Sequence, residues 1–282
     1  MWTRLQDSFL SNDPIEQKFR ELGKRSEGVI VAYLMGHDPD PQSFLANAVS
    51  LIEGGADILE VGIPFSDPVA DGPTIQAAGM RALSAGATPR LILDTIGELS
   101  AQFTVPIVTL TYYNPILAMG VERFIRTACD RGVSGMVVPD LPLEEADAFR
   151  HMALKHNLDS IYLAAPNTST ERLQSIVNKS KGFLYLVSLY GVTGPRDILS
   201  AQSLDAVKKV KSLTRGKIPI SAGFGISQPE HVSSLLRAGA DGAIVGSALV
   251  RIVAEHLDNP EETPYHLKKN ISALKQASKQ HH

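Results

Sequence analysis

Eight short apolar runs recur along the chain, and segments with a helical spacing of apolar residues separate them. The runs are rich in Val, Ile, Leu and Tyr, as is typical of parallel strands buried on both faces. They lie at 29–35, 58–64, 106–113, 135–139, 160–165, 183–189, 219–224 and 242–249. In one intervening segment Leu204, Val207 and Val210 share a face, while Lys208 and Lys209 point the other way. The pattern predicts alternating strands and helices.

This alternation implies βαβ units and a parallel sheet. Glycines at 54–55, 132 and 239 stand just before three of the runs, where a left-handed helix cap would lead into the next strand. Eight units in about 250 residues match a (β/α)8 barrel. A doubly wound open sheet is the alternative, but no G-x-G-x-x-G fingerprint follows the first run.

We therefore predict an α/β fold, a (β/α)8 TIM barrel that forms a single domain over residues 1–282. A short amphipathic helix from residue 14 to about residue 24 should precede the first strand. Residues 1–13 and 277–282 are expected to be frayed ends.

Composition narrows the class of protein. The chain is 44% hydrophobic and 20% charged, with a net charge of −3, so there is no electrostatic case for nucleic acid or an anionic membrane. No apolar run approaches the ~18 residues of a membrane span, and the N-terminus lacks a signal-peptide pattern. A single cysteine, Cys129, excludes an internal disulfide and fits a reducing compartment. We expect a cytoplasmic protein.

The second run carries a carboxylate among apolar residues. With a period of two, Glu60 lies on the face opposite Leu59 and Val61. The loop that follows adds Asp67 and Asp71 and is stiffened by prolines. Because burying an unpaired charge is costly or forces protonation, these acids favour an acid–base site. A strand edge and ordinary turns would explain the same residues, and the rest of the chain must decide.

In a barrel, active sites lie at the carboxyl ends of the strands. Polar residues gather at those ends in the first five predicted strands, and glycine-rich loops follow the last three, at 191–194, 223–227 and 246–247. Glycine loops at this place are the recurrent phosphate site of the fold. Tyrosines 33, 112 and 185, with Leu110 and Leu163, would form either a core layer or the wall of a flat apolar pocket.

Two other kinds of chemistry lack the residues they need. No lysine lies within a predicted strand, which argues against a Schiff base. The eight histidines show no metal-ligand spacing, so we predict no metal site, and we expect His37, in the first loop, to be solvated. What remains is carboxylate chemistry on a phosphorylated substrate.

The stretch LEVGIPFSDPVADGPTIQ at 59–76 resembles the signature of the tryptophan synthase alpha subunit family nearly position for position. The motifs YYNP, PDLP, GVTG, GFGIS and VGS, at 112–115, 139–142, 191–194, 223–227 and 245–247, continue the likeness in order. It covers roughly residues 15–275, and a signature of this length is highly specific.

The resemblance implies a lyase that cleaves indole-3-glycerol phosphate to indole and glyceraldehyde 3-phosphate. Glu60 would be the acid–base residue, and Asp71 would hold the indole N–H. The substrate would contact Tyr33, Leu110, Tyr112, Tyr185 and Thr193. The phosphate would be bound by Gly194, Gly225, Gly246 and Ser247.

The resemblance also implies a partner, the pyridoxal-phosphate beta subunit, in an α2β2 assembly that Asp67, Pro68 and residues 113–119 would face. No pyridoxal phosphate motif occurs in this chain, so we expect the cofactor only in the partner. A lyase that works without a beta subunit stays open at this stage. A sugar-phosphate isomerase barrel is the nearest rival among enzymes, although its acids typically follow other strands.

Overall fold

The computed structural model describes residues 13–188 and 199–279, and within them all the strands form one parallel sheet. The strands are β1 Val29–Met35, β2 Ile58–Gly62, β3 Ile107–Leu110, β4 Val133–Val137, β5 Asp159–Ile161, β6 Leu163–Ala164, β7 Leu184–Val187, β8 Ile220–Gly223 and β9 Gly242–Val245. Their order is β5-β4-β3-β2-β1-β9-β8-β7-β6.

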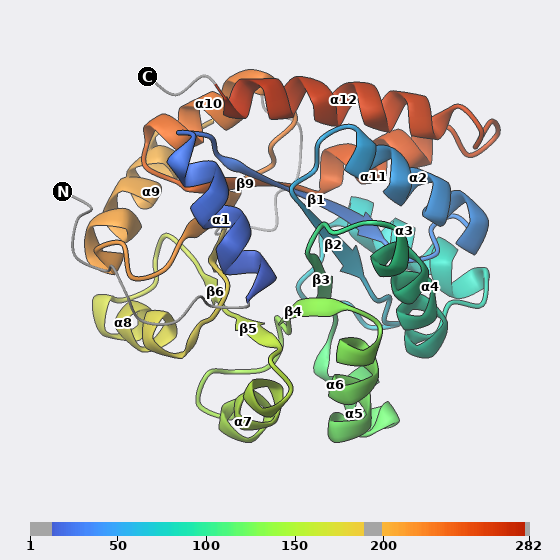
Figure 1. The fold of residues 1–282 in the computed structure, drawn as a ribbon, viewed down its shortest axis with the longest axis horizontal. Helices are drawn as coiled ribbons and strands as arrows, with labels where there is room; N and C mark the ends of the chain where they lie inside the picture. The colour runs from blue at the N-terminus through green and yellow to red at the C-terminus, as the bar shows by residue number, and fades with distance from the viewer. Residues whose placement is uncertain (1–12, 189–198, 280–282) are drawn as a thin grey trace.

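The two outermost strands in that order, β5 and β6, are neighbours in the sequence, and only Tyr162 separates them. They are the two halves of the fifth predicted strand: β5 pairs with β4, and β6 pairs with β7. The bend at Tyr162 therefore brings the two edges of the sheet together. The result is the predicted (β/α)8 barrel, visible as a ring of strands inside a ring of helices (Figure 1).

The helices exceed the eight of a minimal barrel within the described ranges. They are α1 Pro14–Lys24, α2 Pro41–Glu53, α3 Pro73–Ser84, α4 Pro89–Gln102, α5 Tyr113–Met119, α6 Val121–Asp130, α7 Asp147–Lys155, α8 Thr170–Lys179, α9 Ala201–Thr214, α10 Pro229–Arg237, α11 Ser247–Glu255 and α12 Thr263–Ser278. The connections after β2 and β3 and the chain after β9 each hold two of them. None of these helices is long and apolar enough to cross a membrane.

Several predicted strands were too long at their carboxyl ends, and two of them ran into the helix that follows. Residues 246–249 continue an apolar run, but α11 begins at Ser247, and α5 likewise begins at Tyr113. Hydrophobicity alone cannot separate a buried strand from the first turn of a buried helix. The predicted frayed ends also extended too far into the chain. Asp13 caps α1, and Ser278, the last residue of α12, is fully buried.

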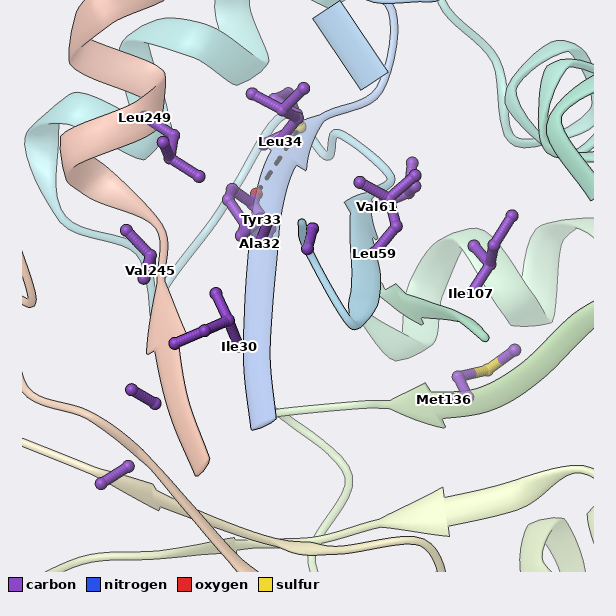
Figure 2. Close-up of a cluster of buried hydrophobic side chains, with 14 of the residues drawn as sticks. Ile30, Ala32, Tyr33, Leu34, Leu59, Val61, Ile107, Met136, Val245 and Leu249 are labelled. Carbon is purple, nitrogen blue, oxygen red and sulfur yellow. Dashed lines mark hydrogen bonds between the residues drawn. The ribbon is translucent and has the colours of Figure 1, made fainter. Parts of the chain in front are cut away.

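Both faces of the strands are buried, which explains the continuous apolar runs. On β1, Ile30, Ala32 and Leu34 face outward and belong to the cluster that packs against the helices, where Leu249 of α11 also lies (Figure 2). Val29 and Val31 face inward and share a second cluster with Ile58 and other strand residues. Since Glu60 lies two residues after Ile58, it faces the barrel interior.

Helix α1 closes the end of the barrel at which the strands begin. Ile15, Phe19 and Leu22 of this helix join the inner cluster, and the Phe19 ring lies 5.8 Å from the ring of Phe183. The Asp13 side chain accepts from the first backbone N–H groups of the helix, which fixes its start. Because α1 covers this end, we expect ligands to reach the interior from the opposite end, where the strands finish.

The end of the barrel that α1 covers, where the strands begin, carries two matching carboxylates, Asp57 before β2 and Asp241 before β9. Asp57 accepts from the Ile30 N–H at 2.8 Å and from Lys275 Nζ at 2.9 Å. Asp241 accepts from the Ile220 N–H at 2.9 Å and from Lys211 Nζ at 2.7 Å. Each acid thus ties the start of a neighbouring strand to a helix. The predicted left-handed glycines stand beside them, with φ of 106° at residue 55 and 105° at residue 239.

We expect Asp57→Ala to lower the free energy of unfolding by about 1–3 kcal/mol, because it leaves the buried Ile30 N–H without its acceptor. Urea unfolding followed by circular dichroism measures the effect. Glu53→Ala is the matched control: its ion pair with Lys268 is half exposed, and such pairs contribute about 0–1 kcal/mol. Equal losses in the two variants would contradict the structural role of Asp57.

Candidate active site

Glu60 lies in the interior of the barrel with no exposed surface. The strand register sets it beside Tyr33 of β1 and Val108 of β3. Neither of its carboxylate oxygens has a hydrogen-bond partner in the described part of the chain. Burial, together with the negative charge of Asp71, raises the pKa of Glu60 to about 8. Glu60 is therefore mostly protonated at neutral pH, and none of the described residues forms a hydrogen bond with its carboxyl.

Asp71 reaches the same interior from the loop after β2. Its backbone carbonyl accepts from Gln76 Nε2 at 2.8 Å, which ties the loop to α3. Burial raises the pKa of Asp71 to about 6, and a hydrogen bond with the Tyr112 hydroxyl opposes the shift. At neutral pH the pair thus holds one ionised and one protonated carboxyl, because the two groups titrate about two pH units apart.

Tyr112, at the end of β3, anchors this loop. Its hydroxyl accepts from the Ala70 N–H at 2.9 Å, and its ring lies 5.5 Å from the ring of Phe65. Burial and the charge of Asp71 raise the pKa of Tyr112. Only 2% of Tyr112 is exposed, so its ring is part of the buried apolar surface next to Asp71.

Tyr33 and Tyr185 are two further tyrosines near Glu60 and Asp71. The pKa of each is raised, first by burial and then by the charges of Glu60 and Asp71, so both hydroxyls lie within the electric field of the pair. Leu110 is partly buried and packs on the inner cluster together with Tyr185. The predicted acids and the predicted pocket wall therefore converge at one place.

Two glycines that the sequence did not single out for this purpose make room for these tyrosines. A Cβ at Gly62 would overlap the Tyr33 hydroxyl, and a Cβ at Gly223 would lie 3.1 Å from Tyr185 Cε2. The register pairs Gly62 with Leu110 and Gly223 with Val187. Glycine at a strand interior can mark such a close approach, and this was the signal available in the sequence.

The glycine loops after β8 and β9 follow the carboxyl ends of these strands, at the same end of the barrel as Asp71. Gly225 has a φ of 74°, a left-handed conformation that favours glycine. Gly246 precedes α11 and lies against Tyr33, whose Cβ would be 3.7 Å from a Cβ at residue 246. Among the described residues no side chain caps α11, so the first N–H groups of this helix, those of Ser247 and Ala248, could bind an anion. Thr193 and Gly194 lie outside the described residues.

Asp67 and Pro68 occupy the outer part of the loop that carries Asp71. Asp67 is exposed and accepts from the Ser66 hydroxyl at 2.5 Å. The neighbouring Val69 is 84% exposed, an unusual degree for a large apolar side chain. The two acids of this loop therefore have different surroundings. Asp71 points toward the barrel interior, and Asp67 is exposed to solvent.

His37 differs from the expectation of a solvated loop histidine. It is 3% exposed, and its Nε2 lies 2.9 Å from the Thr95 hydroxyl of α4. Burial lowers the pKa of His37. The adjacent Asp38 is also buried and accepts two hydrogen bonds from Arg81 of α3, at 2.7 and 2.8 Å. Both residues hold the first loop against helices, a role that depends on contacts distant in sequence.

Known proteins resemble this chain over nearly its whole length. The family model described as tryptophan synthase alpha chain matches residues 19–279. The tryptophan synthase alpha chain of Methanoregula boonei is 45% identical over 266 residues, which is 94% of this chain and 98% of that protein. That of Methanocaldococcus jannaschii is 46% identical over 245 residues, 86% of each chain.

Solved structures agree. A Mycobacterium tuberculosis tryptophan synthase structure superposes with a TM-score of 0.86 at 33% identity and covers 95% of this chain and 98% of that one. The tryptophan synthase complex from Pyrococcus furiosus gives a TM-score of 0.80 at 41% identity, over 88% of this chain and 98% of that one. Signature, fold and relatives agree, and the chain belongs to the tryptophan synthase alpha chain family.

Proposed function

We propose that this chain cleaves indole-3-glycerol phosphate to indole and glyceraldehyde 3-phosphate in tryptophan biosynthesis, and that Glu60 and Asp71 carry the chemistry. Family membership supports the reaction. The main support for these roles is the environment of the Glu60 carboxyl. It is fully buried, has no hydrogen-bond partner among the described residues and interacts electrostatically with Asp71.

Glu60 would both give and take a proton. Protonated Glu60 donates to C3 of the indole, which converts the ring to an indoleninium. The glycerol hydroxyl next to the ring then loses its proton to the Glu60 carboxylate as the carbon–carbon bond breaks. The bonding electrons return to the ring, indole and the aldehyde separate, and Glu60 is protonated again. A pKa of about 8 suits both directions of transfer near neutral pH.

Asp71 would accept a hydrogen bond from the indole N–H and stabilise the positive charge that develops on that nitrogen. It is the ionised member of the pair, with a pKa of about 6. In a site of low dielectric such a charge is worth more than in water. The flat indole would lie among Tyr33, Leu110, Tyr112 and Tyr185, which are buried or partly buried and form an apolar lining.

The phosphate would bind at the loops after β8 and β9 through Gly225, Gly246 and Ser247, at the positive end of α11. Gly194 would also bind the phosphate, and Thr193 would contact the substrate and orient Asp71. These two assignments rest on the match of the GVTG motif to the family.

We propose that the partner of this chain is the tryptophan synthase beta subunit, and the similar chain from Pyrococcus furiosus, which is part of a tryptophan synthase complex, supports this. We infer that Asp67 and Pro68 face it, and the exposed Val69 beside them supports this. Pyridoxal phosphate belongs to the beta subunit, and we propose that this chain uses no cofactor of its own, because the two carboxyls supply both proton transfer and charge stabilisation. The single cysteine supports a cytoplasmic location.

We expect kcat/KM for indole release to follow a bell-shaped pH profile with limbs near pH 6 and pH 8. The rate should rise as Asp71 ionises and fall as Glu60 loses the proton that it must donate. The two limbs belong to the interacting pair rather than to either residue alone. Steady-state assays from pH 5 to pH 9.5, with circular dichroism at each pH to exclude unfolding, would measure it. A rate that still rises above pH 8 would contradict donation by Glu60.

Indole release from indole-3-glycerol phosphate by this chain alone, and then with a beta subunit added, tests the function. We expect slow release whose rate increases about tenfold or more when the partner is added. This increase corresponds to an activation barrier that is lower by about 1.4 kcal/mol. Fast release that the partner does not change would indicate a lyase that works alone. No release from the folded protein in either case would refute the substrate.

A further inference from the structure

The chain carries a second cluster of polar side chains at the junction of α11 and α12, outside the barrel interior. His256 ends α11, Glu262 precedes α12, and His266 lies in the first turns of α12. One ligand atom from each of these residues lies within 4.8 Å of the others. The three residues lie close together in the sequence, at the end of α11 and the start of α12. Their spacing matches no common metal motif, which is why the sequence did not indicate them.

The turn that joins the two helices holds these residues in place. The Asn259 N–H donates to the His256 carbonyl and the Glu262 N–H to the Asn259 carbonyl, each at 3.1 Å. The two imidazole rings lie 4.3 Å apart, centroid to centroid, at an angle of 33°. Both histidines are half-buried and Glu262 is exposed, so the cluster lies at the surface with one side covered.

His256 is oriented as a metal ligand would be. Its Nδ1 lies 2.8 Å from the Ile252 carbonyl oxygen, which can only accept a hydrogen bond, so Nδ1 carries the proton. The other ring nitrogen, Nε2, then keeps its lone pair. Metal-binding histidines typically donate their second ring N–H to a carbonyl or carboxylate in this way, which fixes the tautomer and the ring direction.

Both histidines open on a cavity of about 410 Å³ between α10, α11 and α12. Asn270, one turn after His266, also lines it, and the Asn270 Oδ1 is buried without a hydrogen-bond partner in the described ranges. Ser227 contributes a second unpartnered buried oxygen, its Oγ. These oxygens are suited to hydrogen-bond a water bound to an ion at the mouth of the cavity.

We propose that His256, Glu262 and His266 bind one Zn²⁺ ion at the α11–α12 junction, apart from the active site. Two imidazoles and one carboxylate are the donor set that this ion accepts in three-ligand sites, where a water takes the fourth position. The alternative is that the two histidines pack as a neutral aromatic pair and bind no ion.

The test is titration of Zn²⁺ into the full chain by calorimetry, after treatment with a chelator and its removal. His281→Ala and His282→Ala are present throughout, so that the terminal histidines do not compete. We expect one Zn²⁺ per chain with a Kd near or below ~10 µM. His266→Gln and Glu262→Gln should each weaken binding about tenfold or more, and Zn²⁺ should raise the unfolding temperature of the parent chain but not of these variants.

His151→Gln is the matched control, since this histidine is exposed on α7 and should leave Zn²⁺ binding unchanged. Glu262 is exposed, so its variant should fold even if His266→Gln does not. Absence of binding at 100 µM Zn²⁺, or equal affinity in the Glu262→Gln variant and the His151→Gln control, would overturn the proposal. The pair would then be an aromatic contact only.

Discussion

Glu60→Gln is expected to lower kcat for indole release by about 10²- to 10⁴-fold, the usual contribution of a general acid–base group. Glutamine has nearly the shape of glutamic acid but cannot transfer a proton in either direction. Because both carboxylate oxygens of Glu60 lack hydrogen-bond partners among the described residues, the substitution breaks no structural contact. Steady-state and single-turnover assays of this chain with a beta subunit present would measure the loss.

The stability of the same variant separates chemistry from folding. The folded pKa of Glu60, about 8, lies above its ordinary value of 4.5. The free energy of unfolding should therefore fall as the pH rises from 4.5 to about 8, because over this range the folded state keeps a proton on Glu60 that the unfolded state has released. The Glu60→Gln variant should lack this pH-dependent loss of stability. Asp57→Asn, a buried acid at the opposite end of the barrel, is the control and should keep near-normal kcat. Near-normal turnover of a folded Glu60→Gln variant would refute the acid–base role.

Asp71→Asn is expected to lower kcat by about 10²- to 10³-fold, the typical cost of removing one group that stabilises transition-state charge. Asparagine can still accept a hydrogen bond from the indole N–H but carries no charge, so KM should change less than kcat. The comparison of kcat and KM for the two proteins measures this difference.

Asp67→Asn is the matched control, because it removes a carboxylate from the same loop where the side chain is exposed. Assayed without a beta subunit, it should behave as the wild type. Equal losses of kcat in the two variants would indicate that the loop needs its net charge rather than a carboxylate at residue 71. A rise in KM alone for Asp71→Asn would assign that residue to substrate binding and not to the developing charge.

The barrel could be predicted because its strands are buried on both faces, which leaves continuous apolar runs in the sequence. A period of two predicted that Glu60 and Leu59 lie on opposite faces of the strand, and the structure showed that the face of Glu60 is the interior one, beside Tyr33. The starts of α5 and α11 were missed, because apolar residues continue from strand into helix without a change in composition. The roles of the individual site residues stay predictions.

By itself the sequence determined the number of βα units, the end of the barrel that carries the acids, and the family. These depend on local periodicity and on a long signature, both of which are written along the chain. The tertiary structure decided how far the carboxyls of Glu60 and Asp71 separate in pKa, because that depends on burial and on the distance between groups from different segments. It likewise decided that His37 is buried against α4, and that His256 and His266 meet. Burial and the meeting of side chains arise only when separate helices, strands and loops pack together.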